Sequence, residues 1–171
     1  PMYFDQGMYS WNHLAGAAME RYGADRLTIP VELNEREIRD SGVQGEMIVY
    51  GYLPMMISAQ CIRKTTLGCS GKSEIMWLKD RKDMRFPVVN QCRFCYNTIY
   101  NSAPLSLLGL SEQVTGLKPN AVRLNFTVEE PAAAGEILDA FFEEYGMSEK
   151  AAEPPVLRNQ FTRGHFKRGV E

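Results

Sequence analysis

Four cysteines are the side chains with the clearest chemical potential in this sequence. They are Cys61, Cys69, Cys92 and Cys95, spaced C-x7-C-x22-C-x2-C, and the 171 residues hold no other thiol. A C-x2-C turn places two sulfurs on one metal in many sites, and four thiolates can enclose zinc or hold an iron–sulfur cluster. No histidine lies in this segment. The spacing predicts an all-thiolate site of either kind, with buried or disulfide-bonded cysteines as the alternative.

Glu32 is the carboxylate best placed for acid–base chemistry or metal binding, and it is our candidate catalytic residue. It lies at the end of a predicted strand, and in α/β barrels the carboxyl ends of the strands face the active site. Glu46 begins its predicted strand, so we expect it to have a structural role. Tyr50 and Tyr52 lie where that strand ends, and they either line a pocket or pack in the core.

The two histidines differ in their surroundings. His13 follows Asn12, a good helix-capping residue, and is expected at the surface or in the cap. His165 lies in a basic stretch that ends at Arg168. Three alternatives are open for this stretch: it folds back over the active face, it binds RNA phosphate, or it is a disordered tail.

Basic side chains lie beside the cysteines, at Arg63, Lys64 and Arg93. Three roles are open for these side chains: to lower the pKa values of the thiols, to bind a nucleic-acid phosphate, or to form a solvated basic face. The sequence has neither a nucleophile-elbow motif nor the helix motif of zinc proteases. Any peptidase activity is therefore expected to be metal-assisted or to need residues outside this chain.

The composition limits the class of protein. With 44% hydrophobic residues, 23% charged residues and a net charge of −2, the chain is unlike a nucleic-acid binder held by bulk charge, although a local basic patch can still contact RNA. No apolar run approaches the ~18 residues of a membrane span, and the first residues lack the features of a secretory signal. We expect a cytoplasmic protein with no membrane partner, in which cysteines stay reduced and bind metal.

Strands and helices alternate in the first 50 residues. A capping box of Asn34 and Glu37 opens one of the helices. The predicted order is a strand from the start to about residue 12, a helix over 12–23, a strand over 26–33, a helix over 35–41 and a strand over 46–50. A fourth strand over 121–128 precedes the clearest helix, which begins at Pro131 and ends at Gly146.

This order predicts an α/β fold, namely a partial (half) βα barrel of about four strands over residues 1–150. A complete barrel has about 250 residues, so we expect a preceding half of the barrel or a homodimer partner to complete it. Residues 52–105 interrupt the pattern as an irregular insertion that holds the cysteines, with one β-hairpin formed by 74–78 and 86–90. Residues 151–171 are expected to form a basic C-terminal tail.

Several segments resemble the collagenase-like peptidase family (peptidase family U32), in the same order along nearly the whole chain. They are Pro30-Val31-Glu32-Leu33-Asn34, the run from Glu46 to Cys61, Leu78-Lys79-Asp80-Arg81 with Phe86-Pro87-Val88, Tyr100-Asn101-Ser102, and Phe161 to Val170. The resemblance implies the C-terminal half of the family's barrel-like catalytic domain. Ile48 and Pro54 stand where the family signature has phenylalanine and cysteine.

The resemblance implies two kinds of function. The family name implies a metal-dependent peptidase that acts on collagen-like or other peptides. Several relatives are instead iron–sulfur proteins that act in hydroxylation of transfer RNA, ribosomal RNA or ubiquinone precursors, with clusters held by four cysteines. The resemblance therefore favours a [4Fe-4S] cluster on the four cysteines, with zinc (Zn) as the alternative, and a role in modifying RNA or a small aromatic substrate. A structural half-domain without turnover is a third hypothesis.

Overall fold

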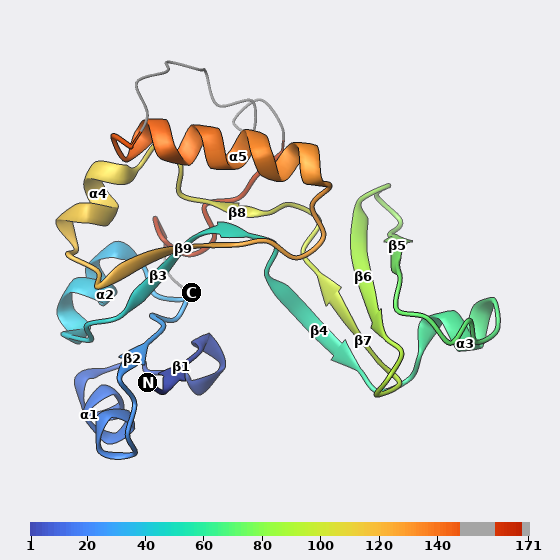
Figure 1. Cartoon of the computed structure of the whole chain (residues 1–171), viewed down its shortest axis with the longest axis horizontal. Coiled ribbons are helices and arrows are strands. Elements are labelled where there is room, and N and C mark those ends of the chain that lie inside the picture. Colours follow the sequence, from blue (N-terminus) through green and yellow to red (C-terminus); the bar gives the residue numbers. More distant parts are fainter. Residues whose placement is uncertain (148–159, 169–171) are drawn as a thin grey trace.

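The computed structural model describes residues 1–147 and 160–168 and has two parts, a body and a four-stranded sheet that extends from it (Figure 1). The strands of the body are β1 (Tyr3–Phe4), β2 (Arg26–Leu27), β3 (Glu46–Gly51), β8 (Leu105–Ser106) and β9 (Ala121–Asn125). Its helices are the 3-10 turn η1 (Gln6–Met8), α1 (His13–Arg21), α2 (Glu35–Ser41), α4 (Ser111–Gly116) and α5 (Pro131–Glu144). The extending part contains β4 (Pro54–Ser58), α3 (Ile62–Thr66), β5 (Ile75–Lys79), β6 (Arg85–Gln91) and β7 (Tyr96–Tyr100).

Strand β3 is the centre of the body. It pairs in parallel with β9 on one side and antiparallel with β8 on the other. Residues 47–50 of β3 are all buried, as expected of a strand covered on both faces. Helix α5 runs over this sheet (Figure 1), and Ile137 and Phe141 on its inner face join the same core.

The predicted helices have the expected local signals. The side chain of Asn34 accepts a hydrogen bond from the Glu37 N–H at 2.9 Å, and the Glu37 carboxylate accepts from the Asn34 N–H at 2.8 Å, so the capping box is confirmed. Asn12 caps α1 through the Ala15 N–H at 3.0 Å. These bonds satisfy the first N–H groups of each helix, which have no partner within it.

The prediction of a half βα barrel with four strands is wrong. The described residues form three separate sheets of two, three and four strands, and none of them closes. Strand β2 ends at Leu27, and a single bridge from Thr28 to Glu46 joins the following residues to β3. The extended run goes no further, because Pro30 has no N–H to donate and a turn follows it. The antiparallel β8 pairs with β3 at Tyr50, whereas a barrel of this type is built from parallel strands.

The first predicted strand is also shorter than expected. Strand β1 stops at Phe4 because Asp5 caps η1, accepting the Gln6 N–H at 2.8 Å. Tyr9 then adopts a left-handed backbone with φ of 50°, which ends any extended run.

The cysteine-bearing segment is more regular than predicted. Strands β4, β7, β6 and β5 form one antiparallel sheet in that order, and α3 lies between β4 and β5. The predicted hairpin is present as β5 and β6, with Trp77 opposite Pro87. Two further strands escaped prediction because β4 and β7 pair with each other across about 40 residues of sequence.

Residues 160–168 pack against the body. Thr162 bridges to Leu105, Arg163 donates from Nη1 to the carbonyls of Ser106 and Leu108 at 2.8 and 2.6 Å, and Phe166 is 4% exposed within the core. The remaining residues of the predicted tail, 151–159 and 169–171, lie outside the described part of the chain.

Candidate functional site

The four cysteines lie at one end of the four-stranded sheet. Strand β4 ends where β7 begins, because Ser58 pairs with Asn97. Cys61 comes three residues after Ser58 and Cys95 two residues before Asn97. The Asn97 side chain also donates to the Gln60 carbonyl at 2.7 Å, which fixes the chain next to Cys61. The pairing of two strands therefore brings Cys61 to the Cys92–Cys95 turn.

The Cys92–Cys95 turn connects β6 to β7. The Phe94 N–H donates to the Gln91 carbonyl at 3.0 Å, and Cys95 has a left-handed φ of 56°. This conformation is unusual for a residue with a side chain and here closes the turn tightly. The Cys92 N–H donates to Ser73 Oγ at 3.2 Å, which links the turn to the loop that contains Cys69.

The loop that carries Cys69 is fixed by an ion pair. Arg63 of α3 contacts Glu74 Oε1 through Nε at 3.0 Å and donates from Nη1 to the Gly68 carbonyl at 3.1 Å. Ser70 donates to the same Glu74 oxygen at 2.6 Å. Arg63, which we considered for thiol activation or phosphate binding, therefore has a structural contact at this end of the sheet. Arg93 instead lies over the Phe94 ring, 5.5 Å from its centre.

The thiols are close enough to influence one another. The pKa of Cys92 is raised, first by partial desolvation and then by the neighbouring thiols of Cys69, Cys61 and Cys95. All four cysteines are free of disulfides. Within residues 1–147 and 160–168, no three His, Cys, Asp or Glu side chains already stand at metal-ligand geometry. The four thiols at this end of the sheet are therefore candidate ligands by their chemistry, and their sulfurs would have to move together to hold a metal.

Glu32 and His165 line a groove on the other side of β4. The groove has a volume of about 590 Å³ and lies between η1 and β4. Its lining comprises Gln6, Gly7, Tyr9, Val31, Glu32, Leu53, Pro54, Met55, Met56, Ile57, Asn101 and His165. The fold thus brings Glu32 and a histidine 133 residues away into the lining of one groove, and the anchored segment 160–168 carries that histidine there.

A second carboxylate, Glu129, lies at the carboxyl ends of the parallel strands β3 and β9, where ligands commonly bind in α/β sheets. Its Oε2 accepts the N–H groups of Thr127 and Val128 at 2.6 and 3.0 Å, whereas its buried Oε1 has no hydrogen-bond partner among the described residues. The pKa values of Tyr50 and Tyr52 are raised, first by burial and then by the charge of Glu129.

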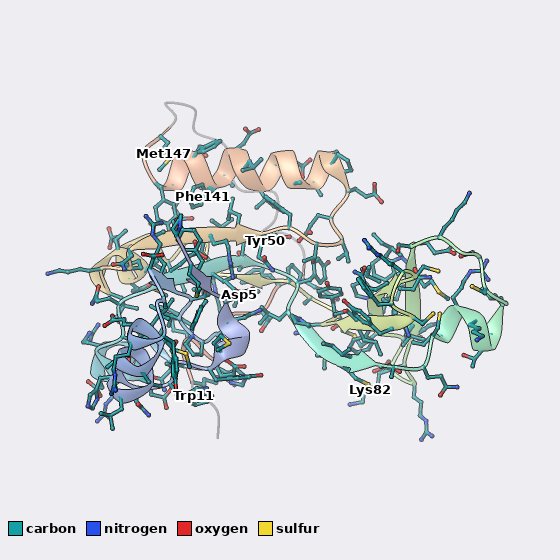
Figure 2. All side chains as sticks on the ribbon, turned by 60° about the horizontal axis from the view of Figure 1, so that its bottom comes forward. Asp5, Trp11, Tyr50, Lys82, Phe141 and Met147 are labelled. Atoms are coloured by element: carbon teal, nitrogen blue, oxygen red, sulfur yellow. The ribbon has the colours of Figure 1, made fainter. Side chains whose placement is uncertain are left out.

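Glu129 is not among the candidate residues that the sequence suggested. The pairing of β3 with β9, in which Gly51 lies opposite Asn125, brings Tyr50 and Tyr52 close to Glu129. In Figure 2, Tyr50 lies in the body below α5, whereas Lys82 lies on the four-stranded sheet.

Glu46 and His13 lie away from both sites. Glu46 pairs with Arg123 at 3.1 Å, and Arg123 also binds Asp5 at 2.6 Å, so Glu46 belongs to an ion-pair network between strands. His13 is exposed at the first turn of α1.

No family model, curated protein or solved structure matches this chain. Among the described residues, no helix is long and apolar enough to cross a membrane. The resemblance to collagenase-like peptidases therefore stays a prediction.

Proposed function

We propose that this protein binds a metal centre through Cys61, Cys69, Cys92 and Cys95. The supporting observation is the convergence of three separate segments on one end of the four-stranded sheet. These segments are the residues after β4, the loop before β5 and the turn between β6 and β7. Hydrogen bonds hold these segments at the same end of the sheet, so the thiols need only local movement to bind one metal.

The preferred centre is a [4Fe-4S] cluster, and zinc is the alternative. Both accept four thiolates, and the family resemblance favours the cluster. A cluster supplies one-electron chemistry, whereas zinc supplies a cross-link that stabilises the fold. The chain's own residues hold the ligands: Asn97 positions Cys61, Ser73 positions Cys92, and Arg63 with Glu74 positions the Cys69 loop.

On this proposal the protein takes part in modifying RNA or a small aromatic substrate. Arg93 supports the RNA reading, because it lies with the exposed Phe94 ring in the Cys92–Cys95 turn, and Phe94 stacks with Tyr96 at 6.4 Å. Stacked aromatic rings next to a cation suit an unpaired base and its phosphate.

The test is metal analysis of protein prepared without oxygen. We expect visible absorption and stoichiometric iron with sulfide, which each single Cys→Ser change removes. Thr66→Ser, in α3 between Cys61 and Cys69, is the matched control and should keep the metal. Colourless protein with stoichiometric zinc selects the alternative centre. Protein that stays metal-free after reconstitution with iron and sulfide, and also with zinc, contradicts the proposal.

A further inference from the structure

The groove between η1 and β4 has the size and lining of a small-molecule site. Its volume of about 590 Å³ falls in the range of known ligand pockets, which are mostly apolar with a few polar groups. The proposed metal centre does not use it, since the cysteines lie beyond the other end of β4.

The apolar wall comes from an irregularity in β4. Neighbouring strand residues normally face opposite sides, yet Met55 and Met56 both line the groove. The pairing register between β4 and β7 shifts between Pro54 and Met56, which is the mark of a bulge, and bulges re-aim side chains. Both methionines are about 60% exposed, at 62% and 59%. Flexible thioether side chains of this kind adapt to apolar ligands of varied shape.

The polar lining of the groove has one carboxylate and no lysine or arginine. Glu32 contributes this carboxylate, which forms no ion pair with any described residue. Tyr9 adds an aromatic ring, which attracts cations through its face. His165 is the other ionisable side chain in the lining. An anionic ligand or an RNA phosphate would meet the Glu32 carboxylate in a groove whose lining has no permanent cation, since His165 is its only basic side chain.

We propose that this groove binds a primary ammonium group carried on an apolar body. Glu32 receives the ammonium group, and Met55, Met56 and Ile57 contact the apolar part. Such a group occurs on a free alkylamine and on a lysine side chain within a peptide. The proposal is independent of the metal centre, because none of the four cysteines lines the groove.

The test is a titration of protein labelled with ¹³C in its methionine methyl groups. The probes are hexylammonium, hexanol and hexanoate, which share an apolar chain and differ in the charge of the head. We expect hexylammonium to shift the methyl signals of Met55 and Met56 but not that of Met147, three residues after α5. A charge-assisted hydrogen bond contributes about 1.5–3 kcal/mol, so hexylammonium should bind at least about tenfold more tightly than hexanol. Met55→Leu and Met56→Leu assign the signals.

Two variants decide whether Glu32 is responsible. Glu32→Gln should weaken hexylammonium about tenfold or more and leave hexanol unchanged, and Glu112→Gln, an exposed change on α4, should alter neither. Equal binding of the three probes, no shift of either methyl signal, or equal effects of the two variants would overturn the proposal. Acetyl-Leu-Lys-Leu amide identifies the source: tighter binding than hexylammonium assigns a lysyl peptide, and weaker binding a free amine. Metal content, measured in the same samples, reports separately on the cysteines.

Discussion

Phe166 provides a direct test of how the C-terminal segment is fixed. Its ring is 4% exposed and packs in the core with Leu33, Ile38 and Met47, and its carbonyl accepts the Glu35 N–H at 2.9 Å. Truncating a buried phenylalanine to alanine removes the transfer free energy of the ring and leaves a cavity, together about 3–5 kcal/mol. For a chain of this size each kcal/mol lowers the melting temperature by about 2–4 °C, so Phe166→Ala should lower it by roughly 6–20 °C.

The assays are thermal melts and urea unfolding, both followed by circular dichroism, with the slope of the urea curves compared between variants. Phe94→Ala is the matched control, since it removes the same atoms from a ring that is 67% exposed, and it should change the free energy of unfolding by less than about 1 kcal/mol. If Phe166→Ala destabilises the protein no more than Phe94→Ala does, the segment is not part of the core. The placement of His165 in the groove would then be wrong as well.

Three further predictions concern the body. Burial acts to raise the pKa of Asp5, but hydrogen bonds and the charge of Arg123 outweigh it, so the pKa of Asp5 is lowered in the folded protein. The ionised carboxylate of Asp5 therefore stabilises the fold above about pH 4, and this stabilisation is lost as the pH falls through the lowered pKa of the folded state. Urea midpoints between about pH 5 and pH 2 should therefore fall more steeply for the wild type than for Asp5→Asn; parallel curves would contradict the pairing. Gly51→Ala should destabilise by at least about 1–3 kcal/mol, because φ is 150° and a Cβ would lie 2.4 Å from the Asn125 carbonyl oxygen. Gly135→Ala in α5, with open space around it, should instead stabilise by about 0.5–1 kcal/mol in the same thermal melts.

The sequence is most informative where structure depends on neighbours along the chain. The Asn34–Glu37 box and the Pro131 start of α5 need only residues within one helical turn, and both are found where predicted. The hairpin of β5 and β6 is likewise local. The half barrel failed because it depends on which distant strands pair, and a two-residue β8 with no strong pattern occupies one side of β3.

In the candidate site, too, the local features can be predicted from the sequence and the contacts between distant segments cannot. The cysteine segment can be recognised from composition, but its arrangement depends on β4 pairing with β7 and on Ser73 binding the Cys92 amide. The lining of the groove depends on the burial of Phe166, which anchors the neighbouring His165 in the same groove as Glu32. Nothing in the local sequence signals these contacts, since each joins segments from different parts of the chain.

The chain leaves the body for the four-stranded sheet and returns to it at one place. Only Tyr52 and Leu53 separate β3 from β4, and the Asn101 N–H donates to the Leu53 carbonyl at 2.9 Å where the chain comes back from β7. Residues 54–100 are thus an insertion whose two ends are adjacent. Insertions of this kind are tolerated within a host domain. Replacing residues 54–100 with a short turn changes the loop-closure entropy of the body only slightly. We therefore expect the body to keep its fold when residues 54–100 are replaced by a short turn.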